Sequence, residues 1–495
     1  MAESTQEEFS VLLYDALNHQ GFSKERIHKR TRNADEYCNT VHRYICTVFD
    51  IDVDASTCIE YIAAGSKGEG VALGGGSDQD FMIKLNFVMC VDQWQEMEES
   101  FVLQNEYSKT TPGYVRLLAR IDFNEEDEVN MVLQNVTRRC SFSWNNYLSS
   151  CLFSQHITNF MQTFSNNVLP LYGFDEFQLM LNGPALTTMY IATLQCESGN
   201  VLEYKQETDL VLGLPFYSHE VMAKWLKRRR NYEWPSTHLQ TDISKLEGVV
   251  VPVGDKLSYE SDIEWRLSYT TAEKKLVHSM DDVQVKLYVV LKYVQKDRLK
   301  PSCKNFTSYI VKNLVFWMLE MTPITAFTPN KLMDIIMAAL RLLRRYLKLL
   351  FLPCYMIPER NLFHGRMTQC DCKRLLRDVE NIIEEGPMFL LNNHFVSLSM
   401  QLTYNYPDTA REYEQWVAEI EDLKPKLDQI SIKLTIAVMF NLDLKTIFDE
   451  DSVTTLIRFC KLLCRDQPVH ELLLRNDAPK IILQRVNTLC RALPM

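Results

Sequence analysis

The chain has 495 residues, of which 46% are hydrophobic and 24% are charged. Its 16 glycines and 17 prolines are too few for a fibrous or disordered chain, so the composition predicts a folded protein with about three domains' worth of residues. The formal net charge of −11 excludes a protein that coats nucleic acid with its whole surface, although local basic runs can still form a patch.

Neither an export signal nor a membrane span is expected. The amino terminus is acidic and lacks a basic start followed by an apolar core. A membrane span needs about 20 largely apolar residues. The most apolar later stretch, residues 334–357, contains four basic residues: Arg341, Arg344, Arg345 and Lys348. We therefore expect a cytoplasmic protein, in which the fourteen cysteines are mostly reduced.

The predicted elements change in type along the chain. Apolar residues at helical spacing predict a helix over residues 7–19, with Gly21 as a stop, and a longer helix that includes residues 37–49. The pattern then becomes strand-like. Strand patterns cover residues 80–90, 184–196 and 201–214, and residues 58–64 read as either a strand or a helix end. After about residue 270 nearly every stretch has a helical pattern.

This order of elements predicts an α+β fold, in which a mixed-sheet lobe precedes an α-helical lobe. We find no internal repeat and no low-complexity linker between the two. The predicted division is an N-terminal helix (1–22), a core lobe (23–270), a helical lobe (271–390) and additional C-terminal helices (391–495).

Residues 63–85, AAGSKGEGVALGGGSDQDFMIKL, contain the clearest candidate site. Asp78 and Asp80 are two residues apart, so in a strand both carboxylates point to one face. Mg²⁺ or Mn²⁺ would relieve their repulsion, and Mg²⁺ is usually held by one or two carboxylates together with substrate phosphates. Upstream, Gly65 and Ser66 allow backbone amides and a hydroxyl to approach a phosphate. Alone, each pattern is also typical of a solvated loop or strand end.

A third carboxylate, Asp209 in the later strand ETDLVLGL, favours the metal-binding interpretation. A Gly-Ser turn, a DxD strand and a third acid on a neighbouring strand resemble the nucleotidyltransferase pattern. The glycines at 74–76 are interpreted as a flexible connection between the Gly-Ser turn and the acidic strand.

Further motifs extend the resemblance over roughly residues 25–390. They follow one another in this order: NGPA (182–185), KWLKRRRNYEWPS (224–236), GVVVPVG (248–254), EWRLSYTTAEKKL (264–276), LYVVLKYV (287–294), SYIVKNLVFWMLE (308–320) and LPCYMIPERNLF (352–363). The series resembles the Mab-twenty-one domain family, which includes cyclic GMP-AMP synthase and the animal cGAS-like receptors. The resemblance implies a bilobal nucleotidyltransferase fold with a long spine helix.

The resemblance also assigns roles to individual residues. Asp78, Asp80 and Asp209 resemble the catalytic, metal-binding acids. The residues that resemble nucleotide-binding positions are Gly65, Ser66, Arg266, Lys292, Ser308 and Tyr309. Within this set, the arginine is expected to read a base, or else to form a structural ion pair, and the tyrosine to stack on a purine. Glu69 also matches the family pattern, without a clear role.

The chain departs from the DNA-sensing vertebrate enzyme at its zinc loop. The segment after the WRLS motif contains His278 but no cysteine, and the close cysteine pairs lack a second metal-binding half, so no structural zinc is predicted. The missing zinc loop disfavours DNA sensing. In this respect the chain resembles the invertebrate receptors, some of which respond to double-stranded RNA. RNA duplexes are read mainly through shape, 2′-hydroxyls and phosphates, so a basic helical face is sufficient.

We predict that the nucleic-acid surface lies at the start of the long helix. Its basic residues are Lys24, Arg26, Lys29, Arg30 and Arg32, with the cluster at residues 227–230 as second choice. The resemblance implies an enzyme activated by nucleic acid that joins ATP and GTP, or other nucleoside triphosphates, into a cyclic dinucleotide in innate immune sensing. The alternatives are a catalytically silent Mab-twenty-one scaffold or binding protein, and a nucleotidyltransferase with a linear product. The oligomeric state stays open.

Overall fold

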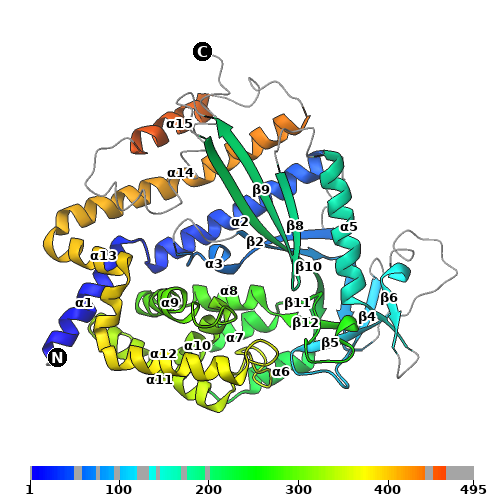
Figure 1. The fold of residues 1–495 in the computed structure, drawn as a ribbon, viewed down its shortest axis with the longest axis horizontal. Coiled ribbons are helices and arrows are strands. Elements are labelled where there is room, and N and C mark those ends of the chain that lie inside the picture. Colours follow the sequence, from blue (N-terminus) through cyan, green and yellow to red (C-terminus); the bar gives the residue numbers. More distant parts are fainter. Residues whose placement is uncertain are drawn as a thin grey trace.

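The computed structural model describes residues 3–48, 58–73, 79–93, 101–119, 133–140, 145–168, 176–195, 201–440 and 450–463. In these residues the predicted order of helices, a strand-rich block and further helices is confirmed (Figure 1). Helix α1 (Glu3–His19) buries Leu13 and Leu17, as its apolar spacing predicts. Gly21 follows with φ +82°, a conformation that glycine adopts without strain, and the long helix α2 (Lys24–Val48) begins three residues later.

Twelve strands in the described ranges form one mixed sheet. Its main path runs in the order β1 (Ile59–Ala64), β2 (Gln79–Leu85), β10 (Val201–Tyr217), β11 (Gly248–Val251), β12 (Glu264–Ser268), β5 (Tyr114–Ala119), β4 (Phe101–Glu106) and β3 (Val88–Val91). Four further strands branch from this path: β6 (Thr137–Arg139), β7 (Asn146–Leu148), β8 (Glu176–Asn182) and β9 (Ala185–Gln195). β10 pairs antiparallel with β9 and β11 but parallel with β2.

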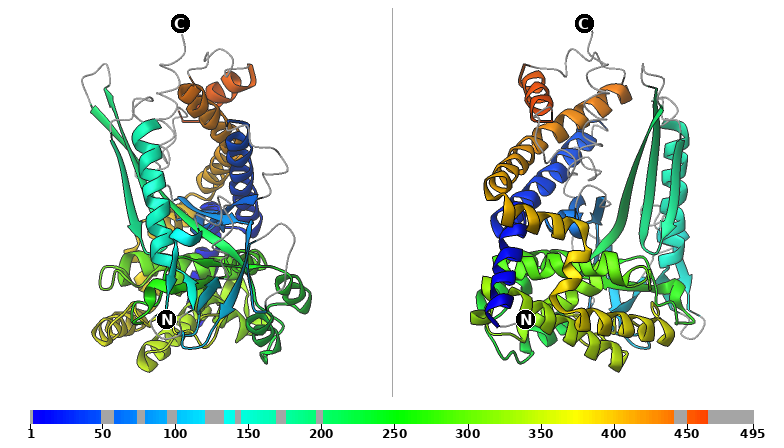
Figure 2. Two further views of the ribbon diagram at one scale, coloured as in Figure 1. Left: turned by 90° about the vertical axis from the view of Figure 1, so that its right-hand side faces the viewer. Right: turned by 60° about the vertical axis from the view of Figure 1, so that its left-hand side comes forward.

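The single strand predicted over residues 80–90 is wrong in its extent. A turn at residues 86–87 divides it into β2 and β3, because Phe87 accepts a backbone hydrogen bond from Phe101 of β4 while Asn86 bonds back to Cys58. The strand prediction for residues 201–214 is confirmed, and β10 continues to residue 217. Strands β8–β10 and helix α5 (Ser150–Val168) project together from the body of the molecule (Figure 2).

The predicted helical character after residue 270 is also confirmed. The helices from β10 onwards are α6 (His219–Lys227), α7 (Thr237–Ser244), α8 (Thr270–His278), α9 (Asp282–Val294), α10 (Ser308–Glu320), α11 (Leu332–Leu349), α12 (Gln369–Glu385), α13 (His394–Asn405), α14 (Pro407–Phe440) and α15 (Glu450–Leu463). Within the described chain, none of the helices is long and apolar enough to cross a membrane.

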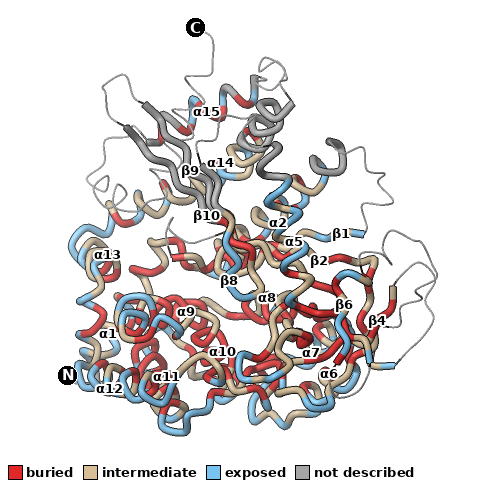
Figure 3. The backbone as a smooth tube through the Cα atoms, turned by 45° about the vertical axis from the view of Figure 1, so that its right-hand side comes forward, coloured by how far each residue is buried: buried red, intermediate tan, exposed pale blue. Residues whose placement is uncertain are grey.

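Helix α9 lies among buried segments of the helical region, between α1 and α10 in this view (Figure 3). It begins with a capping box, in which Asp281 accepts from the Gln284 amide and the Gln284 side chain accepts from the Asp281 amide. Its side chains from Val283 to Lys292 are all buried, so α9 is packed on every side. Consequently its two lysines, Lys286 and Lys292, are held in the interior.

Candidate functional site

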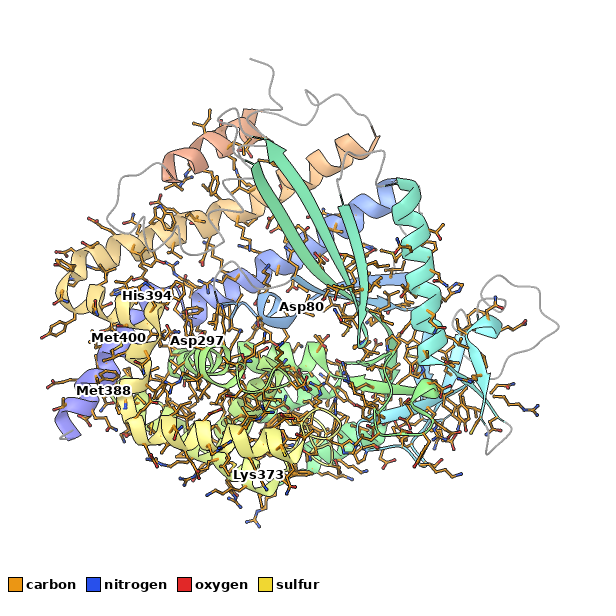
Figure 4. The ribbon with its side chains drawn as sticks, viewed as in Figure 1. Asp80, Asp297, Lys373, Met388, His394 and Met400 are labelled. Atoms are coloured by element: carbon orange, nitrogen blue, oxygen red, sulfur yellow. The ribbon has the colours of Figure 1, made fainter. Side chains whose placement is uncertain are left out.

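Strands β2 and β10 bring Asp80 and Asp209 together. The strands run parallel, and these two residues are direct partners in the register. Paired residues of neighbouring strands point to the same face, so the two carboxylates share one face of the sheet. Asp80 lies near the middle of the molecule, beside the short helix α3 (Gly65–Gly68) (Figure 4).

The Gly-Ser turn packs directly against the Asp80 carboxylate. Ala64, the last residue of β1, pairs with Asp80. Gly65 follows with φ +60°, and a Cβ built on it would lie 1.8 Å from Asp80 Oδ2. Only glycine fits this position, because a side chain would collide with the carboxylate and the positive φ disfavours other residues. The predicted proximity of Gly65, Ser66, Asp80 and Asp209 is therefore a feature of the fold.

Thr187, which was not predicted as a site residue, orients the Asp209 carboxylate. Thr187 of β9 donates a hydrogen bond of 2.5 Å to Asp209 Oδ1, and Asn182 donates to the Thr187 hydroxyl at 2.9 Å. Thr187 is the register partner of Asp209.

The third predicted acid, Asp78, lies outside the described residues, as do the glycines at 74–76. Among the residues that are described, no group of three histidine, cysteine or carboxylate side chains forms a metal site by itself. Asp80 and Asp209 still fit Mg²⁺ or Mn²⁺, because such ions need only one or two carboxylates when substrate phosphates supply further oxygens.

Lys292 reaches from α9 to the Gly-Ser turn. Its Nζ donates to Ser66 Oγ at 2.8 Å and to the Val71 carbonyl at 2.5 Å. The lysine is only 4% exposed. Burial lowers its pKa to about 8, and the neighbouring Lys312 acts in the same direction. Two predicted nucleotide-binding residues, separated by 226 positions in the chain, thus contact each other.

Glu69, whose role the sequence did not indicate, belongs to a buried polar network. Lys312 of α10 donates to Glu69 Oε1 at 2.6 Å and lies 2.7 Å from Glu273 Oε2. Glu273 Oε1 in turn accepts from the Tyr309 hydroxyl at 2.9 Å. Burial by itself would lower the pKa of Lys312, but the two glutamates raise it above its ordinary value. The network therefore fixes Tyr309 relative to the Gly-Ser turn.

Lys312 and Glu273 were missed by sequence reasoning. A lysine inside the apolar helix SYIVKNLVFWMLE was the available signal, because a buried charge needs a partner. Ser308, the first residue of α10, stands beside Tyr309 at the start of the same helix. Arg266 on β12 lies two strands away from β10 and shares its surroundings with Tyr309.

The predicted nucleic-acid surface on α2 faces helix α14. Arg30 Nε donates to Glu421 Oε1 at 2.7 Å, and Arg26 donates to the Glu414 carbonyl at 2.8 Å. Lys29 pairs with Asp422. The Lys24 amide bonds Asp282 at 2.8 Å, and Arg32 lines a hollow of about 580 Å³ further along α2. Nucleic-acid binding by these five residues stays a prediction.

Half of the second basic cluster has structural partners. Arg228 and Arg230 both contact Glu320 Oε2, at 2.7 and 3.2 Å. The Arg228 guanidinium also stands over the ring of Trp317, 4.6 Å from its centroid. In contrast, Lys227 and Arg229 are exposed. Within this cluster, these two could meet a phosphate backbone without losing a described internal contact.

Residues 284–381 match the family model described as Mab-21 protein HhH/H2TH-like domain. The match runs from α9 into α12 and includes Lys292, Ser308 and Tyr309. It confirms the predicted resemblance to the Mab-21 domain family. No curated protein matches the chain. Domains of this family are nucleotidyltransferase-like, so the match supports a nucleotidyltransferase-like scaffold.

Proposed function

Since the chain carries a domain of the Mab-21 family, we propose that it is a nucleotidyltransferase that makes a cyclic dinucleotide of the cyclic GMP-AMP type, as a second messenger in innate immune sensing. The observation that carries this proposal is the pairing of Asp80 with Asp209 beside a Gly-Ser turn. A scaffold protein has no need for two acids on one sheet face against an obligatory glycine. In this proposal the fold is bilobal, with α2 as the spine helix between sheet and helices.

Each part of the site then has a task. Asp80 and Asp209, together with the predicted Asp78, hold Mg²⁺ or Mn²⁺. Held there, the ion would supply Lewis-acid activation of a ribose hydroxyl and charge stabilisation for the leaving pyrophosphate. Lys292 and the Ser66 hydroxyl bind the phosphates of one nucleotide, because a buried ammonium is a strong donor to phosphate oxygens. Tyr309 stacks on a base, and the Glu69–Lys312–Glu273 network keeps its ring in place.

We further propose that nucleic acid, in the first place double-stranded RNA, activates the enzyme. A basic face supplies phosphate contacts whose strength falls with salt. On α2, such contacts would have to replace the ion pairs of Arg26, Lys29 and Arg30 with α14. Lys227 and Arg229 provide an alternative surface that needs no displacement.

The proposal is tested with the purified full chain, labelled ATP, GTP, CTP and UTP, Mg²⁺ or Mn²⁺, and double-stranded RNA or DNA. We expect a cyclic dinucleotide, separable by chromatography from a linear product, and its loss in Asp80→Asn and Asp209→Asn. Asp408→Asn is the matched control, since this side chain is 86% exposed at the start of α14. The absence of cyclic product under every condition, or undiminished product in both site variants, would contradict the proposal.

A further inference from the structure

Arg266 and Arg360 both adjoin Tyr114, and Arg366 interacts electrostatically with Arg360, Tyr114 and Tyr309. Arg266 of β12 is the register partner of Tyr114 in β5. The Arg360 guanidinium stands 5.7 Å from the centroid of the Tyr114 ring, and the side chain is 6% exposed. Arg366 follows in the same loop, and its backbone amide donates to the Phe363 carbonyl.

The fold makes room for the Arg360 side chain. Gly113, with φ +89°, lies against it, and a Cβ there would be 2.3 Å from Arg360 Cδ. The loop itself is fixed, because Cys354 donates its amide to the Arg360 carbonyl at 2.8 Å and Arg360 donates to Ile357 at 2.9 Å. The position of this arginine is therefore set by backbone contacts as well as by its side chain.

The positive charges of Arg266, Arg360 and Arg366 disfavour one another. Burial lowers the pKa of Arg266 to about 10, and Arg360 and Arg366 add to the effect. The pKa of Arg366 is likewise lowered by burial and by Arg360. The pKa of Arg360 is raised instead. Burial alone would lower it, but Tyr309 and other nearby groups that become negative on losing a proton outweigh the burial.

No carboxylate neutralises this cluster within the described residues. The acids of the neighbouring loops and helices already have other partners. Glu273 accepts from Lys312 and Tyr309. Asp255 accepts from Thr111 and His364.

Several other buried or half-buried arginines of the described chain have carboxylate partners. Arg116 lies 2.8 Å from Glu260, and both Arg228 and Arg230 reach Glu320. Burying an unpaired charge is costly, so a protein normally supplies a partner. Arg360, which is buried without a carboxylate partner, and the half-buried Arg266 and Arg366 depart from this pattern, which indicates that their partner is an anion from outside the chain.

The cluster and the acidic pair lie at different places along the sheet. β12 is the second strand from β10, and Arg266 pairs with Val251, the residue after Val250, which pairs with Leu214. Continuing this antiparallel register by one residue aligns Val251 with Gly213. Gly213 is four residues beyond Asp209, so the arginine and the aspartate share a sheet face at roughly 15 Å between their Cα atoms. One phosphate group cannot contact both places.

We propose that Arg266, Arg360 and Arg366 form a phosphate-binding subsite that holds a phosphate group of the second nucleotide. Guanidinium groups bind phosphate oxygens in pairs, and three of them match a group with several negative oxygens. The identity of the carrier as a nucleotide rests on the proposed function, whereas the affinity for phosphate groups does not. The subsite gives Arg266 a task different from reading a base.

The test measures binding to the full chain in EDTA, which removes metal-dependent binding at the acidic pair. Titration calorimetry is run with GTP, ATP, inorganic pyrophosphate, and guanosine as a ligand without phosphate. Arg360→Met and Arg366→Met retain much of the side-chain volume and remove the charge. Arg377→Met, on an exposed position of α12, is the matched control.

We expect both variants to weaken binding of GTP about tenfold or more and to leave guanosine binding unchanged, because each loses a charge-assisted hydrogen bond. The pyrophosphate arm distinguishes the source: a similar loss there means that free diphosphate also occupies the subsite. Without ligand, the midpoint of thermal unfolding should stay equal or rise, since a buried repulsion disappears. A structural arginine would give a lower midpoint in both variants with unchanged phosphate affinity, and this result would overturn the proposal, as would equal losses for guanosine and GTP.

The same variants separate this proposal from the proposed function. Cyclic product from the wild-type chain, combined with unchanged phosphate binding in both variants, would refute the subsite and leave the enzyme assignment standing. Phosphate binding that depends on Arg360 in a chain that makes no product would support the subsite and refute the enzyme assignment.

Discussion

Lys292 is a buried ammonium group whose closest contacts are a hydroxyl and a carbonyl oxygen. Neither carries a full negative charge, so its proton is held less firmly than that of a surface lysine. The pKa of about 8 follows from this burial, although Glu69 opposes the shift and Lys312 reinforces it. A phosphate at Ser66 would supply the missing charge and favour the protonated form.

Nucleotide affinity should therefore decrease as the pH rises through 8. For ATP in EDTA, we expect about a tenfold loss between pH 7 and pH 9, since the free protein then loses most of the Lys292 charge. Lys292→Met should bind weakly with little pH dependence over this range. Lys373→Met, at an exposed position of α12 (Figure 4), should behave as wild type. Calorimetry at several pH values measures this, and an unchanged pH profile in Lys292→Met would contradict the assignment.

Lys312 neutralises two buried glutamates at once, so its removal should be costly. Lys312→Met leaves Glu69 and Glu273 without their common cation. We expect a loss of about 3–5 kcal/mol in the free energy of unfolding, as for other broken buried pairs. Lys426→Met removes an exposed pair with Asp451 and should cost less than about 1 kcal/mol. Urea denaturation compares the two, and equal losses would mean that the network contributes little.

At the scale of elements, the contact between α2 and α14 connects the two ends of the described chain. Glu421 is central to it, because its carboxylate accepts from Arg26 and Arg30. Its side chain is 13% exposed, and those of Arg26 and Arg30 are 14% and 21% exposed. Partly buried charges of this kind interact more strongly than surface pairs. Arg26, Lys29 and Arg30 are therefore partly covered by α14, whereas Lys24 and Arg32 are exposed.

Reversing the charge of Glu421 should loosen α14 from α2. We expect Glu421→Arg to lose about 1–3 kcal/mol of local stability, because charge-assisted hydrogen bonds are replaced by repulsion. Hydrogen exchange should become faster in both helices. Glu412→Arg makes the same charge change at an exposed position of α14 and should leave the exchange rates unchanged. Unchanged protection in Glu421→Arg would mean that apolar packing alone holds the helices together.

For the whole molecule, local sequence patterns predicted the order of helices and strands along the chain. Gly65 and Asp80 meet because Gly65 follows a strand that pairs with the strand of Asp80, whereas the neighbouring position of Asp209 was expected from the resemblance to the nucleotidyltransferase pattern. The partners of Lys312 and Arg30 could not be predicted in this way. They come from helices that approach only after the core has packed, and a single sequence contains no signal for which distant charge a buried lysine or arginine will meet.

The acid sensitivity of the folded chain has an identifiable source between α2 and α8. His278 bonds the Thr31 hydroxyl at 2.9 Å, and its ring lies 5.1 Å from that of His28. Burial lowers the pKa of His278 to about 4, and His28 and Lys274 act in the same direction, against Asp35 and Glu69. The folded chain therefore binds fewer protons here than the unfolded chain between pH 4 and the ordinary value of 6.5.

Stability should consequently fall as the pH decreases through this window. We expect His278 to account for a loss of about 1–2 kcal/mol in the free energy of unfolding between pH 7 and pH 4.5, after allowance for its partial exposure to solvent. His278→Gln keeps a hydrogen-bonding side chain but cannot be protonated, so its stability should fall less over the same range. Urea denaturation of both chains at pH 7 and pH 4.5 measures the difference. Parallel losses in the two chains would assign the acid sensitivity to carboxylates instead, because groups such as Asp255, whose pKa is lowered, also lose stabilising charge in acid.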